Sequence, residues 1–159
     1  MSGAGDEDMR TDLEVAIVRA CCSSSDKEEL YWIVSRSQLE FVVKELEQVD
    51  ESKATVMANY QGEALPVISL ERYFGFVAQN ANESSKYMVL RSVDKKKQVR
   101  KLIVQSSDSP KFFKLTRAFS ALDTFSASEN SEHILGAYSL GKGKVGIVPD
   151  VAGIVGNII

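Results

Sequence analysis

The sequence has little histidine and cysteine, and this scarcity limits the chemistry open to it. A single histidine, His133, occurs among the 159 residues, so a His-rich metal site is excluded and His-dependent catalysis has one candidate. The two cysteines, Cys21 and Cys22, are adjacent, and the ring that a bond between neighbours would close is strained. We expect two reduced, buried thiols rather than a nucleophile or redox pair. The sequence therefore predicts a non-catalytic protein with no metal and no cofactor.

Long apolar runs and targeting signals are also missing. No run approaches the ~18 residues that a membrane-spanning helix needs. Residues 1–12 are acidic and lack the basic and apolar regions of a secretory signal. Together with the reduced thiols, these features predict a cytoplasmic protein without direct membrane insertion. The net charge of −3 argues against a general nucleic-acid binder.

What is present is ordinary for a globular domain: 44% of the residues are hydrophobic and 26% are charged. We expect residues 1–28 to form a partly disordered tail with a possible short helix, and residues 29–159 to form one domain. Within the tail, Leu13, Ile17 and Ala20 stand at helical spacing, which favours a helix over residues 11–22. The run from Val15 to Val18 fits a short strand as the alternative.

From Leu30 onward the pattern predicts short strands joined by turns, with minor helix content. Such a series is typical of a β-barrel or β-sandwich. Three hairpins are expected, formed by Leu30–Val34 with Leu39–Val43, by Tyr87–Val93 with Val99–Gln105, and by Tyr138–Leu140 with Val145–Val148 across a Gly-Lys-Gly-Lys turn.

The segment from Ala64 to Leu70 is the most informative strand. Gly62 predicts a turn before it, and Pro66 indicates an edge strand or a bulge because proline lacks a ladder donor. We expect the apolar side chains on either side of Ser69 to fill the core and the aromatic pair after them to cap it. The stretch ending at Gly75 predicts a short helical turn closed by that glycine.

Three blocks of the sequence resemble the CheW-like domain, the receptor–kinase coupling adaptor of bacterial chemotaxis. The most specific block, residues 62–75, is similar to the family pattern R-G-x-x-x-P-V-I/V-D-L-R-x-x-F/L-G. Residues 30–49 resemble the family's opening hairpin and the segment after it, and residues 134–148 resemble its closing hairpin. The resemblance implies a mainly β fold of two intertwined SH3-like five-stranded barrels with short helices.

The resemblance also implies a function without chemistry of its own. A CheW-like adaptor would couple chemoreceptor cytoplasmic tips to a CheA-type histidine kinase by holding both partners in one array. The alternative is a diverged, stand-alone CheW-like interaction domain that serves another regulatory assembly and has lost receptor contact. An enzyme would have to depend on the adjacent cysteines and the single histidine.

The expected protein-binding residues lie in and around the first two blocks. Protein interfaces typically combine apolar side chains with a polar rim. The candidates chosen on this pattern are Leu46, Gln48, Val49, Met57, Gln61 and Gly62. Ordinary packing or surface exposure is the alternative for each of them. Two departures from the family pattern fall nearby, because Gln61 stands where the family has Arg and Ser69 where it has Asp. The loop from Asp50 to Tyr60 is also shorter than the family's usual crossing segment.

Lys95, Lys96 and Lys97 form a basic run at the expected tip of the Tyr87–Gln105 hairpin. A phosphate-binding patch is one interpretation, but the aromatic side chains that stack single-stranded bases are missing there. A solvated turn that discourages strand aggregation is the other. We expect no nucleic-acid partner.

Overall fold

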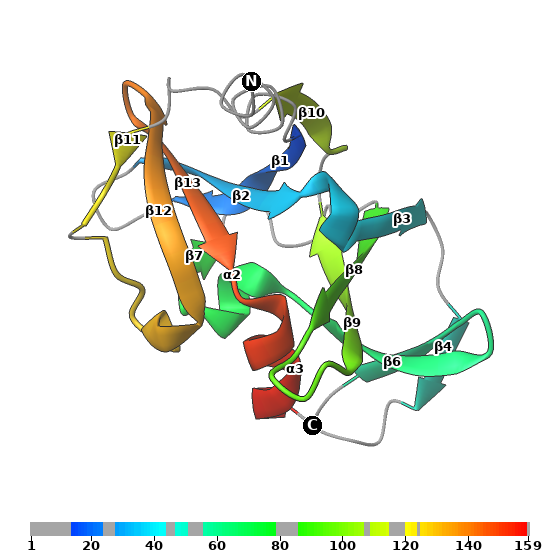
Figure 1. Cartoon of the computed structure of the whole chain (residues 1–159). Coiled ribbons are helices and arrows are strands. Elements are labelled where there is room, and N and C mark those ends of the chain that lie inside the picture. Colours follow the sequence, from blue (N-terminus) through cyan, green and yellow to red (C-terminus); the bar gives the residue numbers. More distant parts are fainter. Residues whose placement is uncertain are drawn as a thin grey trace.

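Two β-sheets and a few short helices make up the computed structural model (Figure 1). It describes residues 14–23, 28–43, 47–50, 56–78, 86–106, 109–114, 120–123 and 125–158. In this part of the chain no helix has the length and apolarity needed to cross a membrane.

Sheet 1 has seven strands in the order β10-β1-β2-β13-β12-β11, with β7 paired to β1. Its strands are β1 (Glu14–Ser23), β2 (Glu29–Ser35), β7 (Val77–Ala78), β10 (Lys111–Lys114), β11 (Ser120–Ala121), β12 (Ile134–Gly141) and β13 (Lys144–Pro149). Its neighbours are antiparallel except for β2 and β13, which run parallel.

Sheet 2 has six strands in the order β3-β8-β9-β6-β5-β4. Its strands are β3 (Leu39–Val43), β4 (Glu47–Asp50), β5 (Val56–Tyr60), β6 (Glu63–Ile68), β8 (Lys86–Val93) and β9 (Val99–Ser106). The helical segments are η1 (Arg36–Gln38), α2 (Leu70–Tyr73), η2 (Ser131–His133) and α3 (Val151–Ile158).

The chain passes back and forth between the two sheets. It forms β1 and β2 in sheet 1, β3 to β6 in sheet 2, β7 in sheet 1, β8 and β9 in sheet 2, and β10 to β13 in sheet 1. This interleaving confirms the prediction of a mainly β fold with two intertwined SH3-like units. Each sheet exceeds the expected five strands, and sheet 1 does so partly through the short β7, β10 and β11.

The helix expected over residues 11–22 is wrong for its described part, because Glu14–Ser23 is the strand β1. Side chains alternate along it: Ala16, Val18 and Ala20 join the core, and Ile17 lies on the opposite face. Helical spacing had grouped Ile17 with Ala20, but pairing with β2 and β10 overrides that weak local signal. Residues 14–23 thus form part of the sheet, whereas the domain was expected to begin at residue 29.

The first predicted hairpin is also wrong. β2 pairs with β1 and β13, whereas β3 pairs with β8 in the other sheet. The polar corner between them forms the 3-10 turn η1, in which the Ser35 backbone N–H donates to Gln38 Oε1 at 3.2 Å. This capped turn redirects the chain from one sheet to the next instead of reversing it within one.

The other two hairpins are confirmed, since β8 pairs with β9 and β12 with β13 along their lengths. The short helix closed by Gly75 is confirmed as α2, and the glycine has a φ of +74°. Pro66 stands in β6, which is an inner strand rather than an edge. Parallel pairing with β9 begins one residue later, at Val67, so the missing donor of Pro66 precedes the contact with β9.

One core cluster is shared by both sheets and α3. It contains the fully buried Trp32 of β2, Leu70 of α2, Leu90 of β8 and Ile154 of α3. Phe74 belongs to it with no exposed surface, and its ring centroid lies 5.9 Å from that of Trp32. A second, smaller cluster fills the other face of sheet 2; its buried members are Ala58, Tyr60, Leu65, Val67, Val89 and Ile103.

Candidate interaction surface

Strands β5 and β6 and the turn between them carry most of the predicted binding residues that the structure describes. Ala58 and Tyr60 face the second core cluster. Met57 and Asn59 alternate with them and lie on the opposite face, where Asn59 pairs with Ala64 of β6. Asn59 and Ala64 are exposed and Met57 is half-buried.

The turn that joins these strands presents two predicted residues to solvent. Gln61 and Gly62 are both exposed, with φ values of +52° and +81°. Positive φ at both central positions is the signature of a tight hairpin turn whose twist matches the strands. We call the residues Met57, Asn59, Gln61, Gly62 and Ala64 the β5–β6 surface.

The remaining predicted residues belong to the neighbouring segment. Gln48 and Val49 lie in the edge strand β4, where Gln48 pairs with Ala58 of β5. The backbone therefore places them beside the β5–β6 surface. Leu46 lies outside the described residues. Met57 lies in β5, and Gln61 follows the end of that strand in the turn.

Ser69, the second departure from the family pattern, is the N-cap of α2. Its hydroxyl caps α2 by accepting from the Arg72 backbone N–H at 3.4 Å, and it donates to Glu71 Oε2 at 2.9 Å. Glu71 is buried and also accepts from Trp32 Nε1 at 3.4 Å. Serine and aspartate are both good N-caps, so the replacement preserves the helix start.

Charged groups pack around the Tyr60 ring. Lys101 Nζ lies 3.2 Å from Glu40 Oε1 and 5.9 Å from the centroid of the Tyr60 ring. Burial raises the pKa of Tyr60, and its hydrogen bond to Glu40 and the charge of that carboxylate raise the pKa further. The phenol is therefore neutral at physiological pH, and it belongs to the packing of sheet 2.

Exposed apolar side chains that the sequence did not single out lie elsewhere. Phe41 stands on the edge strand β3, at the opposite end of sheet 2 from β4. Val93 and Val99 pair across the β8–β9 hairpin beside its tip. Phe112 and Phe113 lie on β10, at an edge of sheet 1. Alternation along each strand was visible in the sequence, but it does not reveal which face stays uncovered.

The basic run lies at the exposed tip of the β8–β9 hairpin, as predicted. Asp94 organises this tip, because its Oδ1 accepts from the backbone N–H groups of Gln98 and Lys96 at 2.9 Å each. Its Oδ2 accepts from Arg100 Nε at 3.0 Å. These hydrogen bonds, led by the one from Gln98, lower the pKa of Asp94.

The residues on which an enzyme would depend lie in different elements of the fold. His133 lies in η2, where its Nδ1 is hydrogen-bonded to the Tyr73 hydroxyl. Cys21 and Cys22 lie in β1, where Cys22 pairs through the backbone with Ala78 of β7. His133 directly precedes β12, the first strand of the closing hairpin.

Comparison with known proteins identifies relatives. The sequence model of the CheW-like domain matches residues 40–158. The fold is similar to the crystal structure of scaffolding protein TtCheW from Thermoanaerobacter tengcongensis, with a TM-score of 0.56 and 15% sequence identity over 87% of this chain and 84% of that one. At this identity, the likeness concerns the fold. No curated protein matches the sequence.

Proposed function

The chain belongs to the CheW-like domain family, and we propose on this basis that it is a non-catalytic adaptor of chemotaxis-type signalling in the cytoplasm. Its partners would be a CheA-type histidine kinase and the cytoplasmic tips of chemoreceptors. The match of the family model over residues 40–158 is the observation that carries the proposal.

The β5–β6 surface supports an adaptor role through its position. It lies at one end of sheet 2, and its turn residues are held by backbone geometry rather than by a flexible loop. Asn59, Gln61 and Ala64 are exposed on it beside the half-buried Met57. A small apolar area with polar neighbours, held on a rigid strand pair, fits the pattern of a protein interface.

Co-purification tests the proposal. The chain is mixed at micromolar concentration with the regulatory domain of a CheA-type kinase and, separately, with a receptor tip. We expect both partners to be retained. Ala64→Glu should weaken retention roughly tenfold or more, because it places an unpaired charge in the interface. Failure to retain either partner would overturn the proposal.

Ala121→Glu is the matched control, since Ala121 is exposed on β11 in the other sheet. The same substitution there should leave retention of both partners unchanged. An equal loss from Ala121→Glu would show that the effect of Ala64→Glu is one of charge or folding, and the β5–β6 surface would then lose its assignment.

One observation favours the second candidate, an interaction domain that has lost receptor contact. The family's Arg position is occupied by the neutral Gln61, which is exposed in the turn and therefore changes the surface rather than the fold. On this hypothesis the chain retains a partner other than the receptor tip, and Gln61→Arg gains receptor binding. Direct binding of the unmodified chain to a receptor tip would contradict it.

A further inference from the structure

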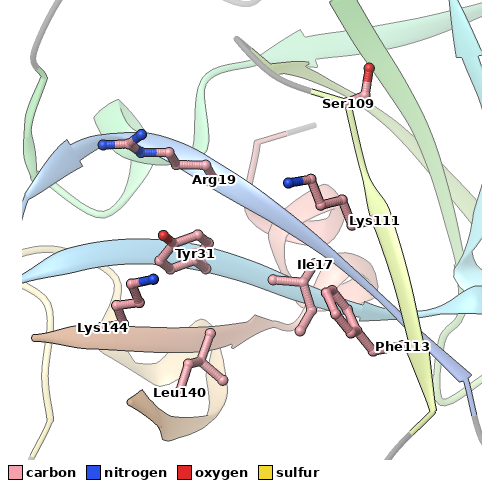
Figure 2. Close-up of a pocket in the computed structure, with 8 residues that line it drawn as sticks. All are labelled: Ile17, Arg19, Tyr31, Ser109, Lys111, Phe113, Leu140 and Lys144. Carbon is pink, nitrogen blue, oxygen red and sulfur yellow. The ribbon is translucent and has the colours of Figure 1, made fainter. Parts of the chain in front are cut away.

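Sheet 1 has a pocket on the face opposite the shared core. Ala16, Val18 and Trp32 face the core, so the residues that alternate with them along β1 and β2 point to the other side. There Ile17 and Tyr31 line a cavity of about 390 Å³ (Figure 2). This volume lies within the range of small-molecule sites.

The corresponding face of sheet 2 is filled. In that sheet, Val89 and Ile103 point away from the shared core into the second cluster, which is closed by residues of β5 and β6. No such cluster of buried apolar residues covers the pocket of sheet 1 among the described residues. In their described residues the two halves of the fold thus differ, because sheet 2 uses this face for packing and sheet 1 has a pocket there.

Cations border the pocket on several sides. They come from three strands: Arg19 from β1, Lys111 from β10 and Lys144 from β13. Figure 2 shows Lys111 and Lys144 reaching toward the centre from opposite sides. Arg19 pairs with Glu29 at 3.4 Å, whereas no ion pair joins either lysine to a carboxylate within the described part of the chain.

The pocket also has an apolar part. Ile17, Phe113 and Leu140 line it from β1, β10 and β12. Phe113 is 46% exposed, which leaves its ring accessible to a ligand. Glu29 offsets the charge of Arg19, so the two lysines provide the local excess of positive charge beside this apolar-lined hollow. Although the net charge of the protein is −3, this local excess attracts an anion.

We propose that this pocket binds a small organic anion, in which a carboxylate or phosphate group is attached to an apolar body. Lys111 and Lys144 would hold the anionic group with charge-assisted hydrogen bonds. The apolar body would cover Ile17, Phe113 and Leu140. The site lies on sheet 1, away from the β5–β6 surface of sheet 2, so it stands independently of the adaptor function.

Lysine side chains can also keep an exposed strand edge from pairing with another chain, and this is an alternative explanation for the two lysines. It would account for Lys111, which lies on the edge strand β10. It does not account for Lys144, because β13 lies between β2 and β12 inside the sheet. A ligand whose binding depends on both lysines would therefore support anion binding over edge protection.

Three probes test the proposal by titration of the full chain, with the amide NMR signals of pocket residues as the readout. They are 3-phenylpropionate, 3-phenylpropylamine with the same body and opposite charge, and inorganic phosphate without a body. We expect saturable binding of 3-phenylpropionate, with shifts at Ile17 and Leu140. The amine should not bind, and phosphate should bind at least tenfold more weakly.

Substitutions then assign the binding to the lysines. Lys111→Gln and Lys144→Gln should each weaken 3-phenylpropionate binding by about tenfold. Lys142→Gln is the matched control, because Lys142 is exposed in the turn that precedes Lys144 and does not line the pocket. It should change binding less than twofold.

The remaining outcomes overturn the proposal. Lack of saturable binding, or equal binding of the amine, would show that the cations do not select an anion. Equal binding of phosphate would show that the apolar residues contribute nothing. An equal loss from Lys142→Gln would show that only the net charge matters.

Discussion

The hydroxyl of Tyr73 is hydrogen-bonded to Nδ1 of His133, 60 residues further along the chain. The two rings are also stacked, with centroids 5.8 Å apart and an angle of 24° between their planes. Asn157 Nδ2 donates to the same hydroxyl at 3.0 Å, which leaves the phenol proton free to be donated to the imidazole. This contact ties α2 to the start of the closing hairpin and to the end of α3.

Tyr73→Phe should lower the free energy of unfolding by about 1 to 2 kcal/mol, because His133 Nδ1 and Asn157 Nδ2 both lose their partner while the ring stays in place. Urea denaturation at neutral pH measures the change. Tyr138→Phe is the control, since no hydrogen bond joins the Tyr138 hydroxyl to the described residues. Equal effects of the two substitutions would contradict a role for this contact.

Phe74→Ala should destabilise the fold by about 3 to 5 kcal/mol, because it removes a fully buried ring that packs against Trp32 and Phe76. Phe41→Ala makes the same chemical change on a side chain that is 56% exposed, and it should cost less than about 0.5 kcal/mol. Thermal and urea unfolding of both variants check this difference. Similar losses would mean that a partner or another part of the chain covers Phe41.

Two glycines should respond to alanine with opposite signs. Gly62→Ala places a side chain at a φ of +81°, where no atom lies within 4 Å, so backbone strain alone should cost about 1 kcal/mol. Gly156 lies in α3, and a Cβ there also meets no atom. Gly156→Ala should therefore stabilise the protein by about 0.5 to 1 kcal/mol through helix propensity. Unfolding midpoints that move in the same direction would contradict these assignments.

Asp94 should contribute stability that disappears in acid. Its pKa is lowered in the folded protein, so the contribution is present above the unfolded value of 3.8 and is lost as the pH falls through the folded pKa. The stability difference between the unmodified chain and Asp94→Ala should therefore be larger at pH 6 than at pH 2.5. A stability difference that is the same at both pH values would contradict this contribution.

Local patterns predicted the parts of the fold that depend on neighbouring residues. The turn around Asp94 predicted the β8–β9 hairpin, and the approach to Gly75 predicted α2, because such turns are determined by a few adjacent residues. The parallel pairing of Leu30 with Val145 joins segments more than a hundred residues apart, and no local signal specifies it. The same limitation explains why Ile17 was assigned to a helix.

The candidate sites likewise include residues that a sequence motif predicts and residues that only the topology brings together. Gln61 and Gly62 were predicted as binding residues because the family pattern includes their turn, and this assignment stays a prediction. Lys111 and Lys144 carry no such motif, and they come together only because β10 and β13 belong to one sheet with β1 and β2 between them. A site assembled from strands that are distant in sequence depends on the topology, which the residue pattern alone leaves open.

The passage of the chain between the sheets has a consequence for how the protein is made. Sheet 1 depends on the pairing of β2 with β13, so its centre stays open on the ribosome until residues 144–149 have been synthesised. Sheet 2 shares its core with that unfinished sheet. Sheet 2 therefore cannot complete the packing of its shared core before β13 is made, and a chain truncated before β13 should be a substrate for chaperones and proteases rather than a working half-domain.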